Sequence, residues 1–176
     1  MEAPLADGRA IEAAGQRHPR LVVILTALAQ LLFVVAAMVL PVAVDAEGER
    51  VYVWRTRDKT LKAFGYLATI FAALGFAFSF SPRLRALDFG TFFLSFVFSL
   101  LTLIYASEES ERHPGGHARV LGVTMWSVAT MLTLGLFAFV STHYLRFFAD
   151  GQSLAAKREP APGETDSVLL PGACLL

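Results

Sequence analysis

The sequence predicts an all-α membrane protein built as an antiparallel bundle of four transmembrane helices. Three observations favour this fold: four long apolar stretches contain no Asp, Glu, Lys or Arg, the charged residues gather between them, and the connections are short. A helix needs about 20 apolar residues to cross the hydrocarbon core of a bilayer, so each stretch is long enough to span it. The expected spans are residues 21–44, 63–82, 89–107 and 120–145.

The stretches divide the chain into a transmembrane domain, residues 21–148, and two flexible tails, residues 1–20 and 149–176. Both tails are rich in Pro, Gly and charged residues and hold too little apolar surface to fold alone. The first stretch is longer than the apolar region of a signal peptide and no clear cleavage site follows it, so it is expected to remain as the first helix. Short connections place consecutive helices antiparallel.

Charge and cysteine content exclude several functions. The chain has 15 basic and 15 acidic residues, so no basic field favours nucleic acid as a partner. Its one cysteine, Cys174, excludes an intrachain disulfide. Proton relays and ion-coupled transporters need ionisable groups within the membrane, and the span interiors have none, which disfavours a small channel or transporter. With no catalytic motif, the chain is expected to be non-enzymatic and to need no cofactor or metal.

The orientation follows from the charges beside the spans. Lys and Arg are almost equally frequent on the two sides. The short turn with Arg83 and Arg85, however, has no acid before Asp88, whereas acidic residues gather in the two longer loops. Both termini are therefore expected in the cytoplasm, most simply at the plasma membrane. Asp88 is expected to cap the third helix, where a carboxylate favours the helix dipole.

Helix packing is the role expected for the few polar and small residues within the spans. Gln30 is the one amide deep inside a span, and a hydrogen bond to another helix is the best way to satisfy it. Small residues at four-residue spacing allow helices to approach closely. The pairs considered are Ala68 with Ala72, Gly75 with Ser79, and Ser95 with Ser99.

The first loop contains a β-branched and aromatic segment, residues 50–56, which is typical of an extended strand. Two interpretations are open for Tyr52 and Trp54. They are either anchors at the headgroup level of the bilayer, or part of a small β-hairpin that covers the outer end of the bundle and offers an aromatic contact to a partner.

Two short motifs invite a functional hypothesis. His113 and His117 lie four residues apart, but the Pro and two Gly residues between them prevent the helical geometry of a metal site, which indicates a solvent turn. Near the C-terminus, Asp166, Leu169 and Leu170 match the D-x-x-L-L pattern of an acidic dileucine sorting signal, which would require a cytoplasmic tail.

With this arrangement assembled, the chain resembles the amastin surface proteins of kinetoplastid parasites, which share a four-helix layout with claudins. The matching features are the sequence from Pro41 to Asp45, the Val53-Trp54 step, the arginine-bearing turn and Tyr105 at the end of the third span. The first outer loop is shorter than in that family and lacks its cysteine pair. The resemblance implies a surface membrane protein without catalysis, involved in membrane organisation.

The leading expectation is thus a tetraspan protein that acts through helix packing, lipid contact and an outer loop. Its partners would be the lipid bilayer and other membrane proteins or further copies of itself. An accessory subunit of a larger membrane complex and a MARVEL-like protein of vesicles or junctions are the alternatives.

Overall fold

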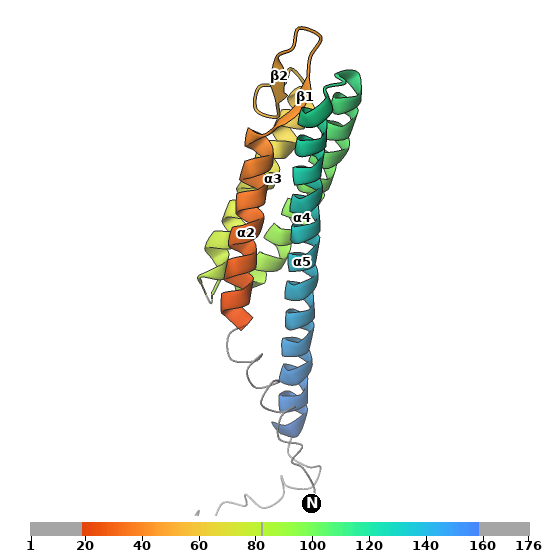
Figure 1. The fold of residues 1–176 in the computed structure, drawn as a ribbon. Helices are drawn as coiled ribbons and strands as arrows, with labels where there is room; N and C mark the ends of the chain where they lie inside the picture. Colours follow the sequence, from red (N-terminus) through yellow and green to blue (C-terminus); the bar gives the residue numbers. More distant parts are fainter. Residues whose placement is uncertain (1–18, 82, 159–176) are drawn as a thin grey trace, which may run out of the picture. The chain divides into compact units, whose positions relative to one another are not determined.

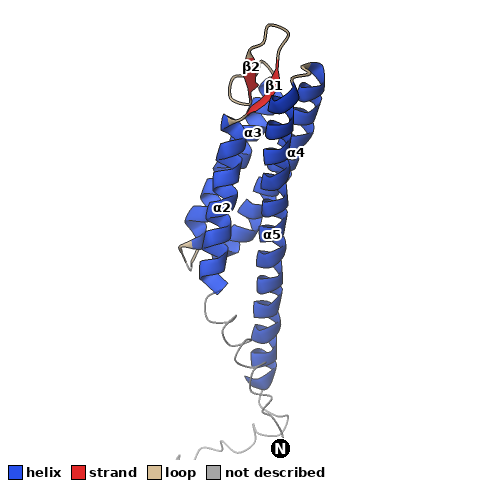
Figure 2. Cartoon of the chain, viewed as in Figure 1, coloured by secondary structure: helices blue, strands red, loops and turns tan. Residues whose placement is uncertain are grey.

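The computed structural model describes residues 19–81 and 83–158, and this part of the chain is helical apart from one β-hairpin and its connections (Figure 2). Four helices are long and apolar enough to cross a membrane, as predicted, and the short two-stranded sheet is also present. In chain order the elements are α2 (Pro19–Val39), β1 (Pro41–Val44), β2 (Arg50–Tyr52), α3 (Lys59–Ser79), α4 (Arg85–Arg112) and α5 (Gly116–Arg158).

The chain forms two compact units, Met1–Val140 and Ser141–Leu176, and the described part of the second is the last part of α5. Within the first unit, consecutive helices run in alternating directions (Figure 1). The hairpin and the α4–α5 connection therefore lie at one end, called here the hairpin end, and the turn between α3 and α4 lies at the opposite end.

The first predicted span is wrong in its last part. Helix α2 ends at Val39, and residues 41–44 form strand β1 instead. Pro41 explains this boundary, because proline has no N–H to donate and its ring clashes with the preceding helical turn. The apolar run continues past the helix because Val42 and Ala43 are fully buried in the protein.

The third and fourth helices are longer than predicted. Helix α4 runs to Arg112, so the acidic segment expected in a loop is helical, and residues 113–115 alone connect it to α5. Helix α5 continues to Arg158, into the segment predicted as a tail. Asp88 is not the cap of α4: the N-cap residue is Leu84, and Asp88 lies in the first turn of the helix and is buried.

The hairpin has an irregular antiparallel register and a turn built around Asp45. Pro41 pairs with Tyr52 and Val44 with Arg50, and the register shifts between residues 41 and 43. The carboxylate of Asp45 accepts hydrogen bonds from the backbone N–H groups of Glu47 at 3.0 Å and Glu49 at 2.7 Å. This side-chain turn closes the hairpin locally.

Helix α3 begins with a side-chain cap. Asp58 has an extended backbone, and its Oδ1 accepts hydrogen bonds from the N–H groups of Thr60 at 2.8 Å and Leu61 at 3.4 Å. Two of the N–H groups that a helix leaves without an internal partner are thereby satisfied. The cap fixes the point at which the chain leaves the hairpin and enters the bundle.

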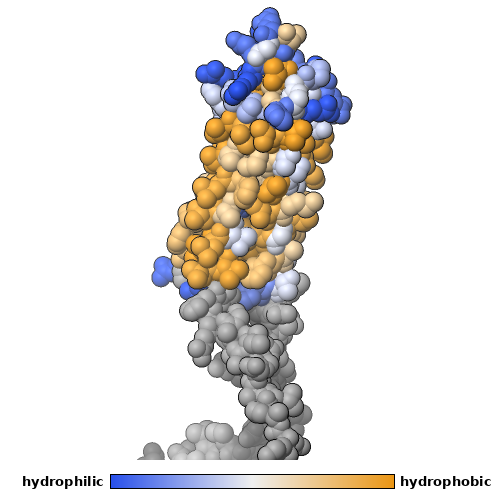
Figure 3. Space-filling view, viewed as in Figure 1, coloured by the Kyte–Doolittle hydropathy of each residue, from blue (hydrophilic) through white to orange (hydrophobic). Residues whose placement is uncertain are grey.

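Large apolar side chains are exposed along the helices, whereas the hairpin end is polar. Figure 3 shows a broad apolar band below a hydrophilic hairpin end. Exposed members of this band come from all four helices; examples are Leu25 at 55%, Leu32 at 60%, Ile70 at 51%, Ile104 at 47% and Met131 at 71%.

Candidate functional site

The α3–α4 interface forms because α3 presents small side chains at regular spacing. The positions alternate by four and three residues, which is the period that keeps one face of a helix against a neighbouring helix. At Gly75 the approach is closest, since a Cβ atom there would lie 2.5 Å from Cε1 of Phe92 on α4. The buried residues of this α3 face are Leu61, Gly65, Ala68, Ala72 and Gly75.

Helix α4 contributes a largely polar face to this interface. Ser95, Ser99 and Thr102 have no exposed surface, and Thr91 is 7% exposed. Buried hydroxyl groups usually bind a carbonyl of their own helix, and Thr102 does so, donating to Phe98 at 2.7 Å. The bundle thus buries several polar side chains among apolar ones, while many large apolar side chains are exposed on its outside, which is unusual for a water-soluble protein.

Gln30 connects three helices through Ser95. Its Nε2 on α2 donates to Oγ of Ser95 on α4 at 2.8 Å, and that hydroxyl donates to the carbonyl oxygen of Ala68 on α3 at 3.2 Å. Gln30 has no exposed surface. The amide that the sequence singled out is therefore placed across helices, and Ser95 and Ala68 are brought to the same point.

The other predicted packing residues have different surroundings. Ala72 and Ser99 have no exposed surface, and Gly75 is buried against α4. Ser79 is half-buried, and its hydroxyl donates to the carbonyl of Gly75 in its own helix at 2.8 Å.

The hairpin is fixed to the bundle by close backbone contacts. A Cβ atom on Gly122 of α5 would lie 2.5 Å from Cα of Val42, and one on Gly115 would overlap with Val44. On the other side, a Cβ atom on Gly65 of α3 would lie 2.9 Å from Cγ1 of Val53. Glycine at these positions lets the hairpin and the chain that follows it rest directly on two helices.

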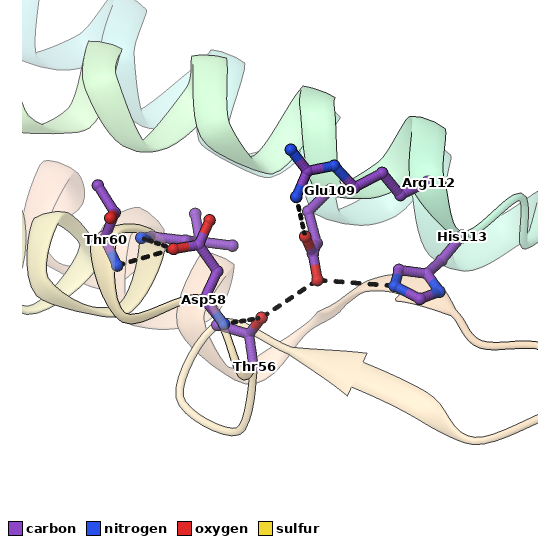
Figure 4. A network of polar contacts seen from close by, with 7 residues as sticks. Thr56, Asp58, Thr60, Glu109, Arg112 and His113 are labelled. Atoms are coloured by element: carbon purple, nitrogen blue, oxygen red, sulfur yellow. Dashed lines mark hydrogen bonds and ion pairs between the residues drawn. The ribbon is translucent and has the colours of Figure 1, made fainter.

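A polar network around Glu109 adds a second attachment at the hairpin end (Figure 4). Oε1 of Glu109 accepts a hydrogen bond from Oγ1 of Thr56 at 3.4 Å and lies 3.7 Å from Nε2 of His113. Oε2 lies 3.8 Å from Nη1 of Arg112. Thr56 also accepts from the N–H of Asp58 at 3.3 Å. The network joins Thr56, in the segment between the hairpin and α3, to the end of α4.

Sequence analysis missed Glu109 and Thr56 because it placed the acidic segment in a loop. A usable signal was present, since Arg112 and His113 follow Glu109 by three and four residues, the spacing of neighbours on one helical face. Trp126 of α5 was also missed, although it is the largest side chain without exposed surface. Its indole lies 3.9 Å from the Cβ position of Gly65.

Tyr52 and Trp54 lie together beside this fixed base. Their ring centroids are 5.8 Å apart, and Cζ of Arg55 lies 4.3 Å from the ring centroid of Trp54. Trp54 is 39% exposed, whereas neighbouring Val53 is fully buried. Burial of Val53 and Thr56 on either side holds the exposed aromatic and basic side chains in place. We call Tyr52, Trp54 and Arg55 the aromatic patch.

Two sequence motifs gave no site in the described residues. The dileucine motif, Asp166, Leu169 and Leu170, lies outside them. Within the described part of the chain, no group of three or more His, Cys, Asp or Glu residues is placed to hold a metal ion. No protein-family model, curated protein or solved structure matches the chain.

Proposed function

We propose that the chain is a non-enzymatic integral membrane protein with four transmembrane helices, which presents the aromatic patch to a partner at the membrane surface. The observation that supports this most strongly is the exposed apolar surface: large apolar side chains cover the outside of the bundle, while hydroxyl and amide groups are buried within its core. A soluble monomer rarely exposes a contiguous apolar surface of this kind, whereas lipid tails cover it without penalty.

The ordered structure of the hairpin end supports the proposed contact with a partner. A partner binds a pre-ordered surface with a smaller loss of conformational entropy than a mobile loop. Tyr, Trp and Arg are the residues most often found at the energetic centre of protein interfaces. Here the patch stands on a base in which Val42, Ala43 and Val53 are fully buried. In this proposal the chain acts as a membrane-organising surface protein of amastin-like type.

Membrane insertion and orientation are tested together. In a Cys174→Ser background, single cysteines at Glu49 and Gly163 are labelled in intact cells with a membrane-impermeant maleimide, and carbonate extraction tests insertion. The proposal expects a carbonate-resistant protein that labels at residue 49 only, with both termini in the cytoplasm. Release by carbonate would contradict insertion, and labelling at residue 163 alone would invert the orientation.

The contact role is tested by crosslinking through the aromatic patch. A photoreactive amino acid replaces Trp54 in one variant and Tyr66, an exposed aromatic of α3, in a matched control. Reproducible protein adducts at residue 54 that are absent at residue 66 support the proposal. Adducts of equal yield at both positions would show that the patch has no special contact.

An accessory subunit of a larger complex is the second candidate. One observation favours it: exposed apolar residues on α2 recur at alternating four- and three-residue spacing, at Leu21, Leu25, Leu28, Leu32, Val35 and Val39. This spacing suits a helix of another protein as well as lipid. Size measurement of the detergent-extracted native protein distinguishes the two, because a hetero-complex of fixed composition would favour the accessory role.

A further inference from the structure

Two polar atoms beside the Gln30–Ser95 hydrogen bond have no partner in the described protein: Oε1 of Gln30 and Oγ of Ser99. Both residues have no exposed surface. Buried polar atoms almost always have a hydrogen-bond partner, and the requirement is strictest where no bulk solvent is near. The pair therefore indicates a small polar ligand inside the bundle.

The hydrogen bonds of Ser95 determine which way the Gln30 amide faces. The only hydroxyl proton of Ser95 is used on the carbonyl of Ala68, so Ser95 can only accept from Gln30. The NH₂ group of the amide must then face Ser95, and its oxygen is left over. That oxygen can only accept a hydrogen bond.

Ser99 differs from many other hydroxyl residues of the helices. Thr102, Ser127 and Thr133 each donate to the carbonyl four residues earlier, at 2.7, 2.8 and 2.6 Å. Ser99 makes no such bond in the structure, so its proton and lone pairs are both available. Because it follows Ser95 by four residues, the two side chains are neighbours on one face of α4.

We propose that a single water molecule binds between Gln30 and Ser99 in the interior of the bundle. It donates one proton to Oε1 of Gln30 and accepts a hydrogen bond from Oγ of Ser99. Its second proton is donated to the remaining lone pair of Ser95, which gives the water three of the two to four polar contacts that a buried water needs. The three side chains that form the site, Gln30, Ser95 and Ser99, are all uncharged, which favours water over a cation.

A double-mutant cycle tests the bridge, because no direct hydrogen bond joins Gln30 and Ser99. Unfolding equilibria of the full chain in mixed micelles are measured for Gln30→Leu, Ser99→Ala and the double variant. We expect the effect of Ser99→Ala to differ by about threefold in the unfolding equilibrium constant between the two backgrounds, the size typical of interhelical polar contacts. Ser127→Ala provides the control cycle with Gln30→Leu, and its effect should be the same in both backgrounds.

A second measurement uses the unmodified chain in lipid nanodiscs. Solid-state NMR with polarisation transfer from water should show a buried, slowly exchanging water next to the Gln30 side-chain amide, and Ser99→Ala should remove that signal. Absence of the water signal would overturn the proposal, as would independent effects in the cycle. The latter result would mean that Ser99 simply turns its hydroxyl onto its own helix.

Discussion

Gly122 of α5 and Val42 of β1 meet backbone to backbone: a Cβ atom on Gly122 would lie 2.5 Å from Cα of Val42 and 2.8 Å from the carbonyl oxygen of Pro41. The nearest atoms at this contact belong to the backbone, which cannot move aside as the end of a flexible side chain can. The hairpin is therefore packed directly against the bundle, and Gly122 is one of the glycines that allow this approach.

Replacing Gly122 with alanine should detach the hairpin from α5. The added methyl group overlaps with backbone atoms, and overpacking of this kind costs about 1 to 3 kcal/mol. We expect a lower thermal stability in detergent and faster hydrogen exchange of residues 41–52. The matched control is Gly135→Ala in the same helix, where no atom lies within 4 Å of the Cβ position. Equal destabilisation by both variants would contradict the contact.

The Thr56–Glu109 hydrogen bond should stabilise the same end of the molecule. Thr56→Val keeps the shape of the side chain but removes the hydroxyl, which donates to Glu109 at 3.4 Å and accepts from the N–H of Asp58 at 3.3 Å. We expect the free energy of unfolding, measured in mixed micelles, to fall by about 0.5 to 1.5 kcal/mol. The lower figure is expected because the hydrogen bond to Glu109 is long. Exposed Thr60→Val is the control, and an equal loss there would show that the effect does not depend on the contacts of the Thr56 hydroxyl.

Capping of α3 by Asp58 predicts a different pattern of substitutions. Asp58→Ala removes the acceptor for the N–H groups of Thr60 and Leu61, which should cost about 1 kcal/mol. Asp58→Asn retains a side-chain oxygen and should recover most of that loss. Thermal unfolding of the two variants under one condition gives the comparison. If asparagine were as damaging as alanine, the carboxylate charge rather than the cap would be responsible.

The four helices could be predicted from the sequence because hydropathy depends on composition alone. Their ends could not, because an apolar residue that faces lipid and one that faces protein look the same. Val42 and Ala43 extend the first apolar stretch, yet they are apolar because they pack inside the protein as strand β1. The segment Glu108–Arg112 gave the opposite error, since charges beyond the apolar band are as compatible with a helix as with a loop.

Single residues of the polar contact between helices could be predicted from the sequence, but the contact itself could not. The depth of Gln30 and the small size of Ala68 can be read from the chain, and both residues are in the polar contact between helices. Ser95 as their common partner could not be deduced, because it depends on how far α2 and α3 are shifted along α4. Such a shift is set by contacts like that of Gly75 with Phe92, which appear only when both helices are placed.

The close approach of α3 and α4 should therefore depend on Gly75. Gly75→Ala places a methyl group 2.5 Å from Cε1 of Phe92, whose side chain is fully buried and has little room to move aside. We therefore expect the free energy of unfolding to fall by about 1 to 3 kcal/mol. Gly90→Ala in α4, with no atom within 4 Å of the Cβ position, should be neutral or slightly stabilising.

The decisive variant is Gly75→Ala combined with Phe92→Leu, which frees space for the methyl group. If the Gly75→Ala variant is destabilised by this overlap, Phe92→Leu should lower the free energy of unfolding less in the Gly75→Ala background than in the unmodified chain. Unfolding in mixed micelles measures both effects. Strictly additive losses would show that Gly75 acts through its backbone freedom and not through contact with Phe92.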